Sequence, residues 1–597
     1  MTNRTKPTVS TGRLMLGMIR YAPWRYAANV TIWATMWLLP IIPALITRAY
    51  FDRLQTEPGF NATTLIAAMF AYGVARLTLM ALGLWNDIHF GYRVTSLLRR
   101  NMLERIYDMP GAQAVHDSPG EMITRFREDV DHVEEALAWT PDLSGTLAFS
   151  IAAAAIMLAI DVRMTLLVFA PLVVMVITAE RFGGRIRRYR TEAREATGRI
   201  TGMLGETLGS VQSIKVAGAE ASTMQQFRGL NETRRRMMVR DRVLTATLES
   251  VFWNLLNIGV GLILVVGASS MADGTLTIGD FALFVYFLDF VTDAGYFVGM
   301  FVAKYKQAGV SLERMSAILG DAPPSSLVEH RELHLTGELP APGAAEDGHD
   351  RLRTLEIDGL TFAYPDSSAG IRDIHLTIPA GSFIVVTGRV GSGKTTLLRS
   401  LLGLVAPDAG EVRWNGRVVT DPDDFFAPPH SAYVAQVPRL FSMSLRDNLQ
   451  LGRDDEDGEL AAAIRSAAFD RDLDAMPKGL DTMIGPLGMR LSGGQVQRTA
   501  TARMFVRRPD LLVIDDLSSA LDVETERTLW DRLFTEHDGT TALVVSHRRP
   551  ALQRADEIIV LEDGAVAARG TFDDLMVSLP EFRDLWAVDE PGESRVL

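Results

Sequence analysis

Residues 383–396, FIVVTGRVGSGKTT, determine the fold of the second half of this chain. A short β-branched run from Phe383 to Thr387 leads into a glycine-rich loop, and a helical pattern follows. This is GxxxxGK[ST] in strand–loop–helix order, and its glycines let backbone N–H groups cradle phosphates at a helix N-terminus. Lys394 would place a charge on the β- and γ-phosphates, and Thr395 would offer a hydroxyl to Mg²⁺. The predicted phosphate-binding residues are Gly388, Arg389, Val390, Gly391, Ser392, Gly393, Lys394, Thr395 and Thr396.

Two more apolar strands are predicted downstream, and residues that can carry chemistry follow each of them. Leu511–Ile514 leads into Asp515 and Asp516, and a carboxylate at the end of a buried strand suits the Mg²⁺ shell. Ala542–Val545 leads towards His547, which could contact a γ-phosphate, although a lone histidine is more often structural. Alternating strands and helices predict a mostly parallel sheet that binds its ligand at the carboxyl ends of the strands.

Composition and charge exclude several classes of protein. A chain of 597 residues is too long for one core, so two or more domains are expected. The net charge of −13 argues against a nucleic-acid partner, which normally selects basic surfaces. With no cysteine, the chain has no disulfide, no thiol catalysis and no thiolate zinc site.

The first half contains apolar runs of the length that a membrane helix requires, about 20 residues. A buried helix of a soluble protein is the alternative for any one run, but six of them in half a chain favour membrane spans. Arginine and lysine gather between the runs in the pattern of a cytoplasmic N-terminus, which also argues for a retained first span over a cleaved signal peptide. The predicted spans are Tyr26–Ile46, Asn61–Leu82, Leu143–Ile160, Met164–Ala179, Ser250–Ala268 and Phe281–Val302.

Two long polar helical stretches, Phe90–Glu135 and Arg181–Asp241, separate spans two and three and spans four and five. Their length predicts helices that extend past the bilayer into the cytoplasm. The first stretch is broken at Asp117-Ser118-Pro119-Gly120, and the second contains GETLGSVQSIKVAGAE at Gly205–Glu220. One interpretation is that these breaks are ordinary loops between helices. The other is that they form short helices that dock on an attached nucleotide domain.

The segment Leu491–Gln495, LSGGQ, resembles the signature of the ATP-binding cassette (ABC) superfamily. Tyr364 in FAYP resembles the aromatic residue that stacks on adenine, and Gln436 in YVAQVPRLF resembles the Q-loop glutamine. Ser519–Asp522 resembles the D-loop, and His547 the switch histidine. With the spans before it, the resemblance covers nearly the whole chain and indicates an exporter-type half-transporter. The helix breaks at Asp117–Gly120 and Gly205–Glu220 lie where this family has its two docking helices.

The resemblance implies an ATPase that works as a dimer, because the signature of one chain would close on ATP held by its partner's phosphate loop. It implies Mg²⁺ ligands at Thr395, Gln436 and Asp515, and catalytic roles for Asp516, His547 and Gln436. The further ATP contacts that it implies are Tyr364, Ser492, Gly493, Gly494, Gln495 and Asp522.

The chain departs from the family pattern in two places. Asp516 stands where the family usually has a glutamate that polarises the attacking water, and misplacement by about 1 Å can cost on the order of 100-fold in rate. We therefore expect slow hydrolysis and favour a heterodimer with one active site over a homodimer that uses Asp516 through a shifted water. The acidic positions usual before the signature are also absent from Thr482–Gly488, which puts their contacts with the docking helices in doubt.

Charged residues inside membrane spans are costly and are therefore functional candidates. Asp289 and Asp293 share one face of the sixth span, and Arg76 lies in the second. They are the predicted substrate site, for a cationic or polar amphipathic cargo or for proton coupling. The alternative is that the acids pair with Arg76, cap helices or meet lipid headgroups. Export of a lipid, drug-like molecule or peptide is the expected activity, with import of a siderophore or vitamin and non-transporting regulation as alternatives.

The predicted fold is thus multidomain: an all-α six-span transmembrane domain with long cytoplasmic helix extensions, and an α/β P-loop ABC nucleotide-binding domain. We assign residues 1–320 to the first, 321–350 to a linker rich in Pro, Gly and acidic residues, and 351–597 to the second. The expected cofactors are ATP and Mg²⁺. The expected partners are a second half-transporter, the lipid bilayer and the cargo. The expected location is a bacterial-type inner or plasma membrane, with the cassette in the cytoplasm.

Overall fold

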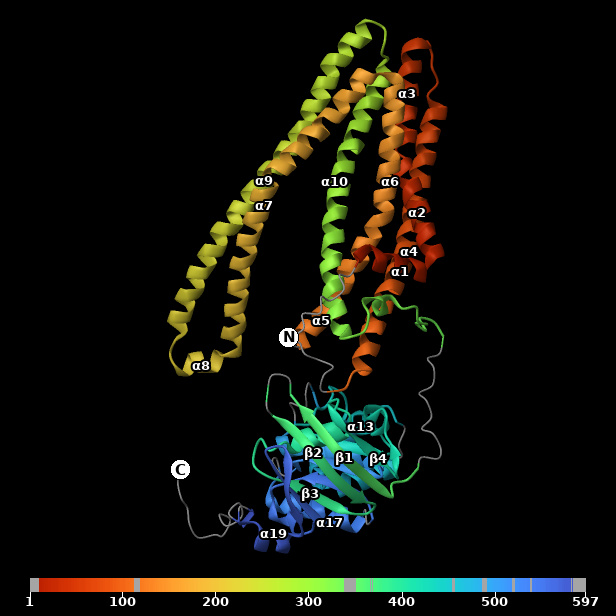
Figure 1. The fold of residues 1–597 in the computed structure, drawn as a ribbon. Helices are drawn as coiled ribbons and strands as arrows, with labels where there is room; N and C mark the ends of the chain where they lie inside the picture. The colour runs from red at the N-terminus through yellow and green to blue at the C-terminus, as the bar shows by residue number, and fades with distance from the viewer. Residues whose placement is uncertain are drawn as a thin grey trace. The chain divides into compact units, whose positions relative to one another are not determined.

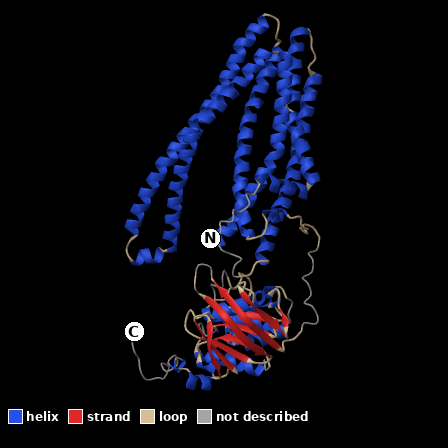
Figure 2. Cartoon of the chain, in the orientation of Figure 1, coloured by secondary structure: helices blue, strands red, loops and turns tan. Residues whose placement is uncertain are grey.

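The computed structural model describes residues 10–111, 119–337, 350–364, 367, 369–453, 457–485, 491–517, 521–536, 539–580 and 582–583. They divide into two compact units. Met1–Arg105 and Asp117–Leu335 form the first, which is helical; Ile106–His116 and Thr336–Leu597 form the second, which combines helices with strands (Figures 1 and 2). The predicted order of a helical membrane domain followed by an α/β domain is confirmed.

Long helices dominate the first unit (Figure 1). Their bounds are α1 Thr11–Tyr21, α2 Pro23–Leu38, α3 Ile41–Thr56, α4 Thr63–Tyr107, α5 Pro119–Thr124, the π-helical turn η1 Arg125–Asp129, α6 Val130–Ile160, α7 Val162–Gly209, α8 Val211–Val216, α9 Glu220–Ala272, α10 Ile278–Ser316, and the 3₁₀ turns η2 Ala317–Leu319 and η3 Pro324–Val328.

Four helical stretches of the described chain are long and apolar enough to cross a membrane. They are Pro23–Thr56, Thr63–Tyr107, Pro119–Ile160 and Ile278–Leu319, and a shorter apolar run, Asn257–Ala272, lies in α9. These stretches hold five of the predicted spans in whole or in part, and the sixth, Met164–Ala179, lies in α7. Large apolar side chains such as Phe70 and Ile151 point outwards, with 76% and 71% of their surface exposed, as lipid-facing residues would.

The helix ends follow local chemistry that shifts some of the predicted boundaries. The first predicted span is divided into α2 and α3 at Leu39–Pro40, because proline has no N–H for the helix ladder. Asp161 caps α7, accepting a hydrogen bond of 2.9 Å from the Met164 N–H. Thr277 and Asp280 form a capping box at the start of α10, where Asp280 also pairs with Arg48 at 2.7 Å.

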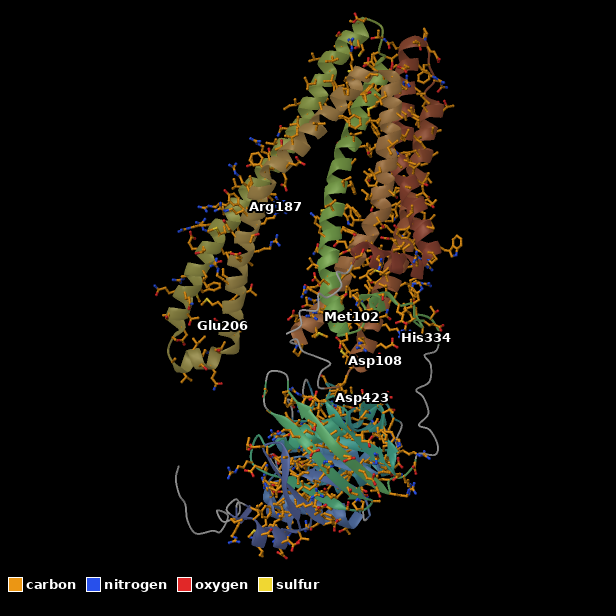
Figure 3. The ribbon with its side chains drawn as sticks, viewed as in Figure 1. Met102, Asp108, Arg187, Glu206, His334 and Asp423 are labelled. Atoms are coloured by element: carbon orange, nitrogen blue, oxygen red, sulfur yellow. The ribbon has the colours of Figure 1, made fainter. Side chains whose placement is uncertain are left out.

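The long polar extension predicted between spans four and five is a helical hairpin of α7 and α9 (Figure 1). α8 joins the two helices within the predicted docking stretch Gly205–Glu220, and Figure 3 shows Glu206 close to that end, with Arg187 farther along α7. The other predicted docking position contains α5; Asp117 and Ser118 lie outside the described residues.

Residues 321–335, at the start of the predicted linker, lie in the helical unit. Leu327 and Val328 are buried, and the Asn101 side-chain amide donates hydrogen bonds to the carbonyls of Leu327 and Glu329 at 2.9 and 3.0 Å. Tyr21 donates a further bond of 3.0 Å to the Arg331 carbonyl. These contacts explain why a segment with linker-like composition is ordered here. Residues 338–349 lie outside the described chain.

The second unit contains two sheets. An antiparallel sheet has the order β2-β1-β4-β5, and a larger sheet has the order β10-β9-β3-β8-β7-β6, in which all pairs except β10–β9 are parallel. The strands are β1 Thr354–Ala363, β2 Gly370–Pro379, β3 Phe383–Thr387, β4 Ala409–Trp414, β5 Arg417–Val418, β6 Ser431–Val434, β7 Leu511–Asp515, β8 Thr541–Val545, β9 Glu557–Glu562 and β10 Ala565–Gly570.

Helices cover the larger sheet and connect its strands. They are α11 Lys394–Leu401, α12 Pro422–Phe425, α13 Leu445–Gln450, α14 Asp457–Ser466, α15 Asp470–Asp474, the 3₁₀ turn η4 Gly479–Asp481, α16 Gly493–Val506, α17 Val523–Glu536, α18 Arg549–Leu552 and α19 Phe572–Ser578.

Strands β3, β7 and β8 are buried along their whole length, with apolar side chains on both faces. One face packs with Trp530 and Phe469, and the other with Leu397 and Leu398 of α11. Burial on both faces is typical of parallel sheets and explains the continuous apolar runs in the sequence. The polar residues that follow these strands therefore collect at one edge, beyond the carboxyl ends.

Candidate active site

The glycine-rich loop after β3 depends on backbone angles that other residues rarely adopt. Gly388, Gly391 and Gly393 have φ angles of 141°, 87° and 99°. A Cβ atom on Gly393 would lie 2.8 Å from the Gly370 carbonyl oxygen, so this position also lacks room for a side chain. α11 begins directly after the loop at Lys394. The predicted strand–loop–helix arrangement of a phosphate site is therefore present, with a helix N-terminus at its end.

Lys394 and Ser392 hold polar atoms suited to an anionic ligand. The Lys394 ammonium donates to the carbonyl oxygens of Gly388 and Arg389, each at 2.8 Å, and burial lowers the pKa of Lys394 while Asp515 and Asp516 oppose that effect. Ser392 is 4% exposed, and its Oγ has no hydrogen-bond partner among the described residues. A phosphate oxygen would satisfy this hydroxyl and give the ammonium a charged partner, so the loop fits a nucleotide.

Asp515 ends β7 as a buried carboxylate, 1% exposed. Its Oδ1 accepts a hydrogen bond of 3.1 Å from the Thr395 hydroxyl, and its Oδ2 accepts one of 3.4 Å from the Tyr433 hydroxyl. Burial raises the pKa of Asp515 against the effect of the Thr395 bond, and burial raises the pKa of Tyr433 to about 12. A carboxylate and a hydroxyl in contact form the oxygen-donor pair that Mg²⁺ prefers, so these side chains fit the ion.

Asp516 and Gln436 follow neighbouring parallel strands, β7 and β6. The Gln436 Nε2 donates a hydrogen bond of 3.3 Å to Asp516 Oδ2. Asp516 has a φ of 48°, in the left-handed region, and its N–H donates to the Val545 carbonyl of β8 at 3.0 Å. The chain is therefore turned sharply at this point, and the turn directs the carboxylate of Asp516 towards Gln436.

His547 follows β8, next to the end of β3. Its Nδ1 lies 3.4 Å from the Thr387 hydroxyl, and burial, helped by the charge of Lys394, lowers the pKa of His547. The neutral imidazole is therefore favoured at pH 7. A neutral ring has one donor and one acceptor nitrogen, so it can donate to a phosphate while its other nitrogen accepts from Thr387.

These residues surround one pocket of about 360 Å³. Three lining residues, Ala369, Gly370 and Val545, were not predicted; they are small or apolar, and the sequence gives no signal for them. Gly388, Arg389 and Ser392 belong to the same loop without lining the pocket. The predicted residues that do line it are Val390, Gly391, Gly393, Lys394, Thr395, Thr396, Gln436, Asp515, Asp516 and His547.

Tyr364 is not among the residues that line the pocket, but it is bonded to one of them. Its N–H donates to the Ala369 carbonyl at 3.0 Å. Its ring packs edge-on against Phe362, with the ring centroids 5.0 Å apart. The aromatic residue therefore lies at the start of the connection that brings Ala369 and Gly370 to the pocket.

The signature residues Ser492, Gly493, Gly494 and Gln495 do not line this pocket either. They form the start of α16, where Ser492 Oγ accepts a hydrogen bond of 3.3 Å from the Gln495 N–H and Gln495 Oε1 accepts one of 2.9 Å from the Ser492 N–H. Gln495 also donates to Asp472 at 3.0 Å. Asp472 could not be found from the sequence, because α15 meets α16 only in the folded domain.

Asp522 is exposed and binds the first turn of α17. It accepts hydrogen bonds from the Thr525 N–H at 2.9 Å and the Thr525 hydroxyl at 2.8 Å, and these bonds lower the pKa of Asp522. Ser519 and Ala520, the first residues of the predicted D-loop, lie outside the described chain.

The three predicted substrate residues are exposed in the helical unit: Asp289 and Asp293 on α10 and Arg76 on α4. Arg76 donates to the Tyr72 hydroxyl at 3.2 Å, and within the described part of the chain no ion pair joins it to either aspartate. The sequence did not reveal Trp37, whose indole N–H donates to Asp142 at 2.7 Å and whose ring packs against Phe297 at 4.6 Å.

Two sequence families match this chain. "ABC transporter transmembrane region" matches residues 28–294, and "ABC transporter" matches residues 371–519. The chain is 28% identical over 428 residues to the probable multidrug resistance ABC transporter ATP-binding/permease protein YheI of Bacillus subtilis, covering 71% of this chain and 70% of that protein. It is 27% identical over 482 residues to the ATP-dependent lipid A-core flippase of Chromobacterium violaceum, covering 79% of each.

The fold resembles that of a bacterial Atm1-family ABC exporter solved with ATP bound. The TM-score is 0.77 at 18% identity, over 96% of this chain and 99% of that chain. The two family matches cover most of this chain and lie in the same order as the two structural units. The chain therefore belongs to the ABC transporter family, with an N-terminal membrane-spanning region fused to an ATP-binding cassette whose ATPase activity drives transport.

Proposed function

We propose that this chain is one half of a dimeric exporter and that its own pocket holds ATP firmly but hydrolyses it slowly. The observation that carries the proposal is the composition of the pocket, which contains the phosphate loop, Asp515, Asp516, Gln436 and His547 but none of the signature residues. A second cassette would supply the missing anion site at the start of its own α16.

Each pocket residue has a role that follows from its position. The loop from Gly388 to Gly393 and the Lys394 ammonium hold the phosphates, and Tyr364 stacks on the adenine. Thr395, Gln436 and Asp515 hold Mg²⁺, which when bound neutralises phosphate charge. Asp516 orients the water that attacks the γ-phosphorus as the bond to the leaving oxygen of ADP breaks. His547 donates a hydrogen bond to the γ-phosphate.

The position of Asp516 supports slow turnover. Its carboxylate is one methylene shorter than the glutamate usual in the family and is held by Gln436 at 3.3 Å. Displacement of the carboxylate by about 1 Å would cost on the order of 100-fold in rate. We therefore propose a heterodimer, in which the LSGGQ segment of this chain completes an active site on a partner that carries glutamate after its metal aspartate.

The cargo site that we propose lies on α10. Asp289 and Asp293 are exposed there without an ion pair among the described residues, and Phe297 follows one turn later with its ring against Trp37. Carboxylates beside aromatic rings attract cations that have an apolar body. Arg76, on α4, would contact an anionic or polar part of the same cargo. Relatives named for multidrug resistance and for lipid flipping support a drug-like or lipid cargo.

Turnover of the purified protein tests the proposal. The chain would be purified alone and together with a co-expressed half-transporter that has the glutamate. We expect phosphate release by the pair to exceed that of the chain alone by roughly 100-fold. A chain that forms a homodimer and hydrolyses as fast as the pair would contradict the heterodimer, and Lys394→Ala serves as the inactive control for the chain alone.

A further inference from the structure

Arg548 directly follows His547. Its side chain reaches the segment from Leu521 to Glu526, which does not line the ATP pocket. Its Nη1 lies 3.2 Å from Glu526 Oε2, and its Nη2 donates to the Leu521 carbonyl at 3.3 Å. Leu521 directly precedes Asp522, and Glu526 lies in the first turn of α17. The Arg548 guanidinium therefore connects the backbone next to His547, the candidate phosphate contact, with Leu521 in the D-loop segment.

Glu526 is an unusual partner because it is almost fully buried, with 1% of its surface exposed. Its Oε1 accepts a hydrogen bond of 3.2 Å from the indole N–H of Trp530, which is itself buried in the apolar core. Burial raises the pKa of Glu526, while the Trp530 bond and the charge of Arg548 oppose that effect. A carboxylate in such a place is favourable only with a partner, and Arg548 supplies the positive charge.

The backbone of Arg548 is also fixed. Its N–H donates to the Ser546 hydroxyl at 3.1 Å, and the Ser546 N–H donates to the Val386 carbonyl of β3 at 3.2 Å. The connection therefore runs from the central strand of the sheet, past His547, through a planar guanidinium to two points around Asp522. Arginine can reach both points because its donors form a fixed fork, whereas a lysine offers one charged centre.

We propose that Arg548 is a positioning residue that couples His547 in the ATP pocket to the Leu521–Asp522 segment. Through this connection the presence of a γ-phosphate at His547 sets the position of the segment that meets the second cassette. The inference rests on the proposed dimer, since the position of Asp522 affects turnover only where a second cassette contacts it. It assigns to Arg548 and Glu526 an effect on turnover but none on ATP affinity, because neither side chain lines the pocket.

The experiment must separate positioning from folding, because Arg548→Ala alone leaves Glu526 buried without its charge partner. The Arg548→Ala/Glu526→Gln double variant removes both charges together. Arg527→Ala is the matched control, since Arg527 lies on the same helix with 75% of its side chain exposed and only a 3.9 Å contact with Asp531. All variants would be made in the full-length transporter with its partner half, and Arg548→Lys would test the need for the fork.

For the double variant we expect a thermal midpoint close to wild type, an unchanged KM for ATP, and kcat lowered roughly 10- to 100-fold. Arg548→Lys should show an intermediate kcat, and Arg527→Ala should match wild type. A double variant with wild-type kcat would overturn the inference, since Arg548 would then only neutralise Glu526. Equal losses in kcat and in ATP affinity would overturn it too.

A second readout does not depend on hydrolysis. The chain has no cysteine, so a single spin label at Glu524→Cys, an exposed position beside the segment, reports its motion. We expect ATP with Mg²⁺ to immobilise the label in the wild-type background and to have no effect in the double variant. An equal response in both backgrounds, or none in either, would overturn the coupling, whereas the proposed function would stand as long as the transporter pair hydrolyses ATP.

Discussion

Gln436 donates a hydrogen bond from its Nε2 to Asp516 Oδ2 at 3.3 Å, which links the residues that follow two adjacent parallel strands. In this way the fold places a short carboxylate beside the proposed Mg²⁺ ligands, where the family usually has the longer glutamate. The relationship makes Asp516 the most informative position for mutation.

Lengthening the side chain should restore hydrolysis. We predict that Asp516→Glu raises kcat for ATP hydrolysis roughly 10- to 100-fold, because the added methylene moves the carboxylate towards the attacking water. Asp516→Asn should lower the remaining activity further, since the amide cannot take a proton. Phosphate release by this chain purified without its partner half would check both, because the faster site of the partner would mask the change in the pair. A glutamate variant no faster than wild type would contradict the prediction, since Asp516 would then already reach the attacking water.

Lys394 should determine affinity for ATP. We predict that Lys394→Ala weakens ATP binding roughly 10- to 100-fold, because a charge-assisted contact with phosphate is lost. Lys478→Ala is the matched control, as it removes an exposed lysine of the same domain. Equilibrium binding of a fluorescent ATP analogue would measure both. An unchanged dissociation constant in Lys394→Ala would show that Lys394 does not contribute to ATP binding.

His375, on β2, should make the stability of the cassette depend on pH. Hydrogen bonds of its Nε2 with Asp373 at 2.9 Å and its Nδ1 with Asp358 at 2.7 Å raise the pKa of His375 above the usual value of about 6.5. The stabilisation is therefore fully present below the unfolded pKa and is lost as the pH rises through the folded pKa. The difference in thermal midpoint between wild type and His375→Gln should shrink between pH 6 and pH 9; a difference that grows would contradict this prediction.

The charges on α10 should affect the response to cargo. We predict that Asp289→Asn and Asp293→Asn reduce the stimulation of ATPase activity by the lipophilic cation ethidium, while basal activity remains within about twofold. The reason is that an exposed carboxylate attracts a cation near the membrane interior more strongly than an amide does. Asp273→Asn, outside the helices, is the control. Undiminished stimulation in both α10 variants would exclude these residues from the cargo site.

Local patterns made much of the cassette predictable. The phosphate loop, the strand ends at Asp515 and His547, and the parallel sheet all depend on contiguous residues with a fixed period. The structure confirms the sheet and brings ten of the predicted residues to one pocket. Tyr364 was predicted from resemblance alone, and in the structure it is connected to the pocket through Ala369.

Contacts between distant residues could not be predicted from the sequence. Trp37 and Asp142 are 105 positions apart, and each alone resembles an ordinary helical residue. Glu526 resembles one more acid at the start of a helix until the fold buries it beside Trp530. The break at Pro40 could not be predicted for a different reason. α2 and α3 together form one apolar stretch, and the mean hydropathy of that stretch does not show where a proline interrupts the helix.

Transport in inside-out proteoliposomes tests the central claim most directly. Ethidium and a fluorescent phospholipid would be supplied with ATP and Mg²⁺ to vesicles that contain the transporter pair with its cassettes outside. The account predicts ATP-dependent accumulation of at least one probe inside the vesicles, abolished when both chains lack the phosphate-loop lysine, Lys394 in this chain. ATP-dependent loss of a preloaded probe, or accumulation that persists without these lysines, would contradict it.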